Sequence, residues 1–545
     1  MKMKYLLYLV LIISISSCTD KFEDFNTDKK NPASVAGEAL FSNAQKNLVD
    51  QMSTPNVNRN ITELWAQYWN ETTYTDETNY DIVERGQSEQ IFRYLYRDVL
   101  MDLAEATRLI SDVEPFDNVA AIEKANKLHI IEILNVFVYQ RLVDIFGAVP
   151  YSDALDIGNV YPEYEMGEAI YSDLITRLDA ALAGLDPSYG SYGGADLIYD
   201  GDVDSWIRFA NSEKLKIGIH LADVNSSLAQ STIEDAVADG VFTSASDEAL
   251  FMYQSGAPNY NQIHAELIVT GRKDFVSTNT IIEIMAGVND PRLDNYFDPT
   301  SIQPLPFPLD ENTGSNADIV YEDGENTILF YPLGGGEYDE VFIEGPFTVP
   351  ASDSAAGIMT WLGGTYGAAS QHSRHTQVST DITEATFPGL VMTYSEVLFY
   401  LAEAAARAYN VGMTAEEAYD AGITESILWW GGSQQDADDY LAYPDVAYAT
   451  ANGDWKQKIA TQSWIASYIN GLLGYTTWRR LDYPVLNITP TNEEIQEVTD
   501  IPVRFTFPVN EQSLNEDNYA AASEAIGGDD LLTKIFWDLY DANAN

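Results

Sequence analysis

The histidines are the residues whose type and spacing come nearest to a metal site. His372 and His375 lie three residues apart in a segment with the composition of a loop, and no third ligand follows at a spacing typical of zinc sites. The chain also contains no Gly-x-Ser-x-Gly, no His-Glu-x-x-His and no phosphate-binding glycine loop. We therefore expect no metal centre at this pair. Because these catalytic motifs are absent, we also expect no enzymatic activity.

Acidic residues offer two other kinds of chemistry. Asp200, Asp202 and Asp204 alternate as in the first half of an EF-hand calcium loop, but Ser205 and Asn211 occupy the positions that need glycine and glutamate. We expect Asp202 or Asp204 to cap the following helix instead. A structural calcium ion elsewhere remains compatible with so acidic a chain, and we expect no other cofactor. Because 84 acidic residues provide many chance pairs of carboxylates, glycoside hydrolysis stays open as an alternative.

Aromatic side chains mixed with polar ones are typical of a sugar-binding surface, because sugars present flat C–H faces and hydroxyl edges. Two stretches have this mixture, and the candidate ligand-binding residues in them are Tyr74, Asn79, Tyr80, Trp361 and Tyr366. We expect the four aromatic ones to be exposed. Trp65, Tyr68 and Trp69 are spaced by three and four, which favours a buried helical stripe. The same surface would serve a peptide, and the sequence leaves that alternative open.

The single cysteine, Cys18, ends a short apolar N-terminal segment. Lysines precede the apolar run and small residues precede the cysteine, as in a secretory signal, and the run is shorter than the roughly 20 residues of a membrane helix. Ile15-Ser16-Ser17-Cys18 resembles a bacterial lipobox, which implies cleavage before Cys18 and lipidation of that residue. We expect a signal peptide over 1–17 and a lipidated N-terminus and tether over 18–32. An ordinary signal peptide with an incidental cysteine is the alternative.

Charge and composition restrict the partners and the class of protein. Lysine and arginine number 29 against 84 acidic residues, a formal net charge of −55, and such a field effectively excludes nucleic acid as a partner. Hydrophobic residues make up 46% of the chain and aromatic ones 12%, which is ample for a core. The acidity therefore belongs to a folded surface and not to a disordered tail.

Apolar residues recur at spacings of three and four along much of the chain, which predicts a mainly α-helical protein. The clearest run covers 118–146 and stops at Gly147, as helices commonly do. Further helices are predicted over 88–110, 166–185, 204–223, 390–409, 415–428 and 455–470. Between about 240 and 387 the pattern gives way to Gly, Pro, Ser, Asp and Asn with short β-branched runs, which predicts irregular structure with minor β.

Six segments along the chain carry a family resemblance. They cover 144–155, 206–216, 290–297, 392–404, 478–484 and 501–505, the last followed by Glu511 and Asn515. Together they resemble the SusD/RagB family of outer-membrane lipoproteins from Bacteroidetes, and they occur in that family's order. The segment 65–69 (WAQYW) is similar to the SusD-like branch.

The resemblance implies a fold, a function and a partner. It implies one α-helical domain over 33–545 on tetratricopeptide-like helix pairs, with the loop-rich portion at about 240–387 supplying the ligand face. It implies a non-catalytic lipoprotein that binds a glycan or oligosaccharide and sits as a lid on a SusC-like TonB-dependent β-barrel. The protein would be anchored in the outer membrane through its lipid and face the exterior. A peptide-binding lid of the same family and a surface-anchored glycosidase are the alternatives.

Two ion pairs are predicted within these segments. Glu403 and Arg407 are spaced for a pair between residues i and i+4 of one helix. Glu396 lies in an apolar stretch and needs a cationic partner if it is buried. Since cations are scarce in this chain, we predict that Arg479 or Arg480 fills that role. The alternative is that Glu396 lies at a helix edge and is solvated.

Overall fold

The computed structural model describes residues 35–82, 85–298, 361–489 and 500–540, together with the backbone of three strands between 319 and 344. Cys18, the predicted signal peptide and the predicted tether lie outside these residues. The described chain is mainly helical, as predicted, and its buried hydrophobic residues form one continuous core. Within the described ranges, no helix combines the length and the apolar character needed to cross a membrane.

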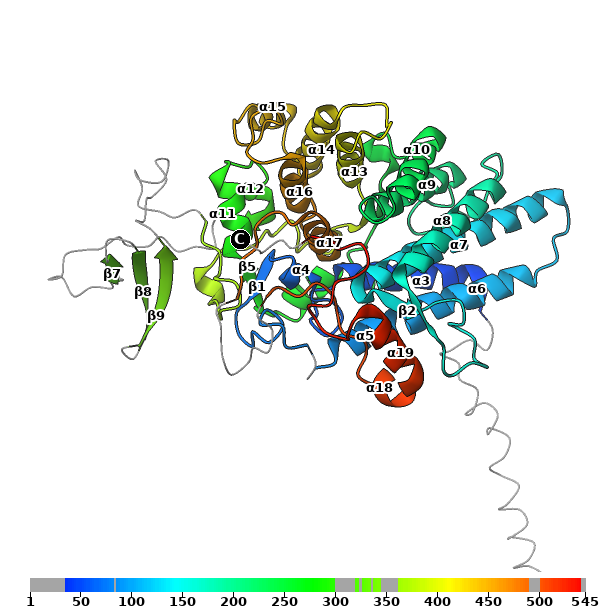
Figure 1. Cartoon of the computed structure of the whole chain (residues 1–545), viewed down its shortest axis with the longest axis horizontal. Helices are drawn as coiled ribbons and strands as arrows, with labels where there is room; N and C mark the ends of the chain where they lie inside the picture. The colour runs from blue at the N-terminus through cyan, green and yellow to red at the C-terminus, as the bar shows by residue number, and fades with distance from the viewer. Residues whose placement is uncertain are drawn as a thin grey trace, which may run out of the picture.

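Pairs of helices that follow one another in the sequence form the scaffold (Figure 1). Their members are α7 (Asn118–Phe146) with α8 (Gly167–Gly184), α9 (Val203–His220) with α10 (Ser226–Asp239), α13 (Tyr394–Ala406) with α14 (Ala415–Trp429), and α16 (Trp455–Ala466) with α17 (Gly471–Leu481). The pairs also pack on one another, with α8 against α9, α9 against α13, and α13 against α16. This succession confirms the predicted stack of tetratricopeptide-like pairs.

Local signals set the ends of these helices. Asp117 caps α7 by accepting a hydrogen bond from the Ala120 amide at 2.8 Å. Gly147 follows the last residue of α7 with a φ of +81°, where a side chain would be strained. Asp202 accepts a bond from the Ser205 amide at 3.2 Å and so caps α9, which confirms the capping role predicted for the alternating acids.

The N-terminal helices pack beside this stack. Helix α3 (Gly37–Ser53) lies against α6 (Met101–Ser111). The helix predicted over 88–110 is present as α5 (Gln87–Tyr94), the π-helical turn η1 (Leu95–Leu100) and α6 in direct succession. The short α18 (Glu511–Leu514) and α19 (Glu516–Ile526) lie close to α5 in Figure 1.

Short antiparallel strand pairs lie mostly in the loop-rich part, together with two small helices. The strand pairs are β1 (Trp69–Glu71) with β5 (Phe275–Ser277), β6 (Phe297–Asp298) with β10 (Gln377–Val378), β4 (Ala249–Phe251) with β11 (Gly389–Met392), and β2 (Ala148–Pro150) with β3 (Tyr164–Met166). A three-stranded antiparallel sheet has the order β7 (Ile319–Glu322), β8 (Asn326–Gly334), β9 (Glu337–Glu344). Helices α11 (Asn279–Gly287) and α12 (Leu293–Tyr296) complete this part. Minor β structure was predicted here and is confirmed.

The aromatic stripe that precedes β1 ties the N-terminal segment to the α16–α17 pair. Trp65, Tyr68 and Trp69 are buried, as predicted. The Tyr68 hydroxyl donates to the Trp464 carbonyl, and the Trp69 indole N–H donates to the Tyr468 hydroxyl at 3.1 Å. These contacts place β1 and the loop after it on a rigid base.

The buried ion pairs differ from prediction in one respect. Glu403 pairs with Arg407, as predicted, at 2.9 Å. Arg480 also pairs with Glu403, at 2.5 Å, and not with Glu396, so the predicted Glu396 pairing is wrong. Glu396 lies in the first turn of α13, and its Oε1 accepts from the Tyr400 hydroxyl and sits 3.7 Å from the Lys216 ammonium. Glu403 lies two turns later in α13, beside the last turn of α17, which contains Arg480.

Arg479, the other predicted partner of Glu396, binds backbone groups. Its Nη1 donates to the carbonyls of Asp144 and Val503, at 2.7 and 3.0 Å. Because those carbonyls belong to the end of α7 and to the segment after 500, Arg479 joins three distant parts of the chain.

Candidate functional site

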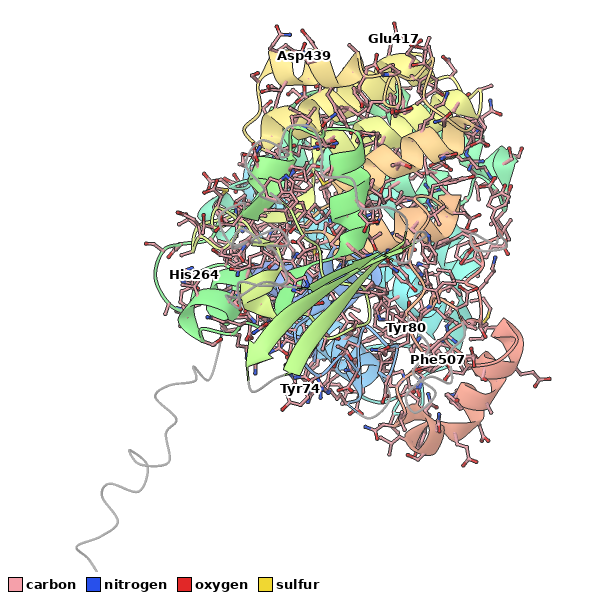
Figure 2. The ribbon with its side chains drawn as sticks, turned by 90° about the vertical axis from the view of Figure 1, so that its left-hand side faces the viewer. Tyr74, Tyr80, His264, Glu417, Asp439 and Phe507 are labelled. Atoms are coloured by element: carbon pink, nitrogen blue, oxygen red, sulfur yellow. The ribbon has the colours of Figure 1, made fainter. Side chains whose placement is uncertain are left out.

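The predicted ligand-binding residues divide into exposed and buried ones. Tyr74 is 79% exposed and projects at the lower edge of the face drawn in Figure 2. Trp361 is half-buried, with its ring 6.1 Å from that of Phe297. Tyr80 and Tyr366 are only 2% and 1% exposed, so the prediction that both are exposed is wrong.

Packing across the loop-rich part explains why the two tyrosines are buried. The ring of Tyr80 meets Trp65 edge-on at 6.2 Å and lies 6.4 Å from the ring of Tyr366. The Tyr366 amide donates to the side chain of Asn279 at 3.1 Å, which draws the glycine-rich segment inward against α11. Residues far apart in the sequence make these contacts, so the local composition did not reveal that the two tyrosines are buried.

Polar side chains fix the loop that carries Tyr74, residues 72–80 (the Tyr74 loop). Asn79 is buried, and its Nδ2 donates to the Gly367 carbonyl at 2.8 Å. Asn70 accepts from the Gly367 amide at 3.0 Å. The first bond holds the Tyr74 loop, and the second holds β1 just before it, against residues 365–370. Asn79 therefore positions the loop from beneath, and Tyr74 alone among the predicted residues stands fully in solvent.

Two buried glutamates close the base of the Tyr74 loop. Glu71 accepts from the amide and the hydroxyl of Thr78, at 3.0 and 2.8 Å. Glu77 accepts from Arg85 at 2.8 Å and from Gln87 at 2.7 Å. Burial, reinforced by the neighbouring Glu77, raises the pKa of Glu71 to about 9. Glu71 is therefore protonated at neutral pH, and the neighbouring Glu77 is paired with Arg85.

We expect the Tyr74 loop to loosen as the pH rises. A raised carboxyl pKa gives stability that is complete below the unfolded-state value of about 4.3 and is lost as the pH rises through about 9. Hydrogen–deuterium exchange, corrected for the intrinsic rate and referred to α13, should show the loop losing protection progressively between about pH 5 and 9. Glu71→Gln, which has no proton to lose, should abolish this change. Identical pH profiles for the two proteins would assign the loosening to another group.

Charged and amide groups border the Tyr74 loop. The Thr72 hydroxyl donates to the Lys273 carbonyl at 2.7 Å, which places the exposed Arg272 and Lys273 beside the loop. His372 lies near the same lysine, and burial together with the Lys273 charge lowers its pKa. An exposed aromatic ring with hydrogen-bonding groups at its rim suits a ligand with flat apolar faces and hydroxyl edges.

The two histidines considered for metal binding have separate partners. The His375 Nδ1 lies 2.9 Å from the Gln371 carbonyl, and the His372 Nδ1 lies 3.0 Å from the amide of Gln377. Among the residues with described positions, no group of three or more His, Cys, Asp or Glu side chains could hold a metal ion.

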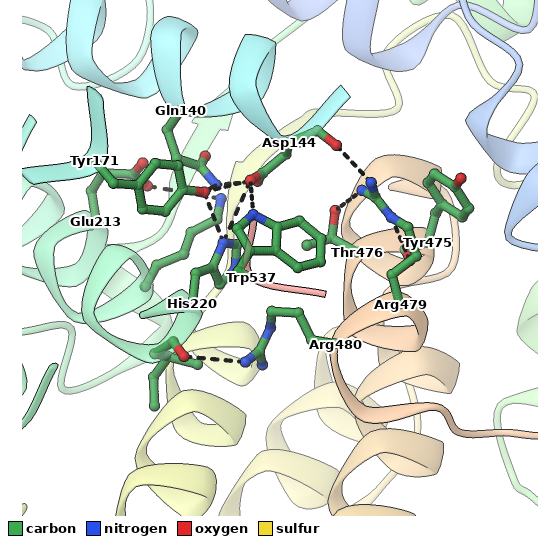
Figure 3. Close-up of polar contacts among 12 residues, drawn as sticks. Gln140, Asp144, Tyr171, Glu213, His220, Tyr475, Thr476, Arg479, Arg480 and Trp537 are labelled. Atoms are coloured by element: carbon green, nitrogen blue, oxygen red, sulfur yellow. Dashed lines mark hydrogen bonds and ion pairs between the residues drawn. The ribbon is translucent and has the colours of Figure 1, made fainter. Parts of the chain in front are cut away.

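A cluster of titratable side chains is enclosed within the scaffold (Figure 3). Asp144 accepts from the Trp537 indole at 3.0 Å and from the Tyr171 hydroxyl, which lies 3.0 Å from His220 Nδ1. Burial lowers the pKa of His220 to about 4, so the imidazole is neutral. The adjoining cavity, bordered by Gln140 and Asp144, has a volume of about 10 Å³, room for one water molecule. No sugar reaches this cluster, and its role is structural.

A larger cleft, which was not predicted from the sequence, lies between α5, η1 and α18. It has a volume of about 480 Å³ and is separate from the Tyr74 loop. The sequence signal was weak, because the lining comes from three segments that are distant along the chain. Apolar residues scattered through the otherwise turn-like stretch 155–161 were the one local indication.

Comparison with known proteins identifies the family. A family model for SusD-like proteins, described as "Starch-binding associating with outer membrane", matches residues 29–314 and 346–508. No curated protein matches the chain.

Solved structures share the fold. A chitin-binding protein is 24% identical over 92% of this chain and 100% of its own, with a TM-score of 0.72. A chitin-binding SusD homologue from Flavobacterium johnsoniae is 22% identical over 93% and 99%, with a TM-score of 0.68. A SusD homologue from Bacteroides uniformis is 22% identical over 92% and 99%, also with a TM-score of 0.68. Because the family model covers most of the sequence and the fold agrees, the chain belongs to the SusD-like family.

Proposed function

We propose that this protein binds a glycan or oligosaccharide at the cell surface and that Tyr74 is the main platform for a sugar ring. The observation that carries the proposal is the 79% exposure of a tyrosine on a loop whose base is fixed by buried hydrogen bonds. A preorganised aromatic ring loses little conformational entropy when a ligand stacks on it. The family description names starch, and two proteins of the same fold are described as chitin-binding. Trp361, half-buried against Phe297, is proposed as a second contact.

We further propose that the protein is a lipid-anchored lid on a SusC-like TonB-dependent β-barrel. The support is the lipobox-like segment ending at Cys18 and a family described as associating with the outer membrane. In this role the protein captures the ligand and returns it unchanged, so we propose binding without catalysis. The anchor at Cys18 holds it to the outer membrane with its body towards the exterior.

Tyr74→Ala should weaken binding about tenfold, because a stacked aromatic ring contributes about 1–1.5 kcal/mol. Isothermal titration with maltoheptaose and with chitohexaose, as fragments of starch and chitin, measures the change. Tyr161→Ala is the matched control, since Tyr161 is also exposed, at 62%, but lies on another surface. That variant should bind like the wild type.

Other outcomes point to the alternatives. Equal affinity of the Tyr74→Ala variant and the wild type would exclude Tyr74 as the platform. Binding of short peptides in place of both oligosaccharides would favour a peptide-binding lid. Shorter sugars in the sample after incubation would indicate a glycosidase.

A further inference from the structure

The cleft between α5, η1 and α18 has the composition of a binding groove. Its volume of about 480 Å³ lies within the range of ligand-binding clefts. Its wall is mostly apolar, with contributions from Phe92, Tyr96, Met101, Pro150, Leu155 and Leu514. Charged groups complete the lining, with Arg93 and Arg97 from the α5–η1 segment and Glu89 and Glu511 beside them. Few hydrogen-bonding groups face the interior of the cleft, so it suits apolar side chains better than sugar hydroxyls.

A π-helical turn shapes one wall of this cleft. Tyr96 and Arg97 both belong to η1, which interrupts the helical run between α5 and α6. Such turns are rare and occur frequently at functional sites, where the altered helical phase redirects side chains. The Tyr96 hydroxyl donates to the Pro150 carbonyl and so joins η1 to β2 across the cleft.

Exposed apolar side chains surround the opening. They are Ile157, Val160, Tyr161, Val509 and Leu514, each between 46% and 85% exposed. Their backbone is held in place, because Asn515 Nδ2 donates to the Pro162 carbonyl at 2.9 Å and Asn518 Nδ2 donates to the Tyr161 carbonyl at 3.0 Å. An apolar patch that is fixed outward around a cleft marks an interaction surface.

The charges at the opening indicate the chemistry of the partner. Arg93 and Arg97 are four residues apart and both exposed, on a chain with only 29 cationic residues against 84 acidic ones. Arg97 pairs at 2.6 Å with the adjacent Asp98, but an exposed pair of this kind contributes little and yields to an incoming carboxylate. The two guanidinium groups therefore complement an acidic side chain next to the apolar cleft.

We propose that this cleft, which we call the α5–α18 groove, docks an extended segment of a partner polypeptide. A bulky apolar side chain of that segment fills the groove, and a neighbouring Asp or Glu pairs with Arg93 and Arg97. The inference rests on the proposed function, because the barrel of the transporter is the polypeptide that function places beside this protein. The groove is separate from the Tyr74 loop, so the ligand and this segment bind at the same time.

Photo-cross-linking in native outer membranes tests the groove. The photo-reactive residue p-benzoylphenylalanine replaces Ile157 in the full lipidated chain, and mass spectrometry identifies the cross-linked peptide after purification. We expect cross-links to one segment of the co-purifying barrel that contains an acidic residue. The double variant Arg93→Glu/Arg97→Glu should lower the yield about tenfold. Arg108→Glu is the control, because Arg108 is as exposed as Arg97 but lies outside the groove.

The outcomes separate the two proposals. A barrel that co-purifies without cross-links from position 157, or with a yield that charge reversal does not change, overturns the groove and leaves the lid function standing. Cross-links to lipid or to this chain alone overturn the groove in the same way. The absence of any co-purifying barrel overturns both the lid function and the groove. Circular dichroism of each variant confirms that the fold is retained.

Discussion

Arg480→Met should lower the free energy of unfolding by about 3–5 kcal/mol, the usual effect of removing one partner from a buried ion pair. Arg480 binds both oxygens of Glu403, at 3.1 and 2.5 Å, and neither side chain is more than 5% exposed. Methionine fills most of the space but leaves the Glu403 carboxylate with Arg407 as its remaining ion-pair partner. The loss should appear as a lower midpoint in urea-induced unfolding.

A surface arginine provides the comparison for Arg480. The side chain of Arg108 is 57% exposed and pairs with Glu105 on α6 and with Asp112, the residue that follows this helix. Arg108→Met should leave the free energy of unfolding nearly unchanged, since exposed pairs are screened by water and salt. Equally small losses for both variants would mean that apolar packing alone holds α13 against α17.

Trp537→Ala should cost about 3–5 kcal/mol of stability, as for other fully buried aromatic residues. The side chain is 2% exposed, and the Arg479 guanidinium lies over its ring at 4.8 Å. Alanine would leave a cavity between the helix pairs and remove the indole donor from the buried Asp144 carboxylate. Circular dichroism in urea measures the change without relying on tryptophan fluorescence.

Leu539→Ala is the control for this segment, because Leu539 is 52% exposed. Its free energy of unfolding should stay within about 0.5 kcal/mol of the wild type. If Trp537→Ala were as mild, the contacts around Asp144 would contribute little to the stability of the scaffold.

Features that depend on neighbouring residues could be predicted from the sequence. The spacing of apolar residues and the stop at Gly147 predicted α7 with its observed bounds. The alternating acids predicted the cap of α9, and the spacing of Glu403 and Arg407 predicted their pair. In each case the interacting atoms lie within a few turns of one helix, so the spacing of the residues along the sequence determines which of them meet.

Features that depend on distant residues could not be predicted in this way. Whether Arg480 meets Glu396 or Glu403 depends on how far α17 is shifted along the axis of α13. No local sequence pattern encodes that shift. Tyr74 and Tyr80 occur in the same kind of sequence, yet one is exposed and the other packs on Trp65. The α5–α18 groove was missed for the same reason, because its walls come from segments that only the fold brings together.

The contact between Asp144 and Trp537 also bears on the order in which the protein is made. The two residues are 393 positions apart, so ribosomes synthesise α7 long before the indole that completes its buried network. Until residues 529–540 emerge, Asp144 lacks this donor, and Arg479, which bridges the same region, lacks the ring beneath it. The early helices therefore reach their full stability only after the C-terminal segment has been made. The scaffold closes only when its distant segments meet.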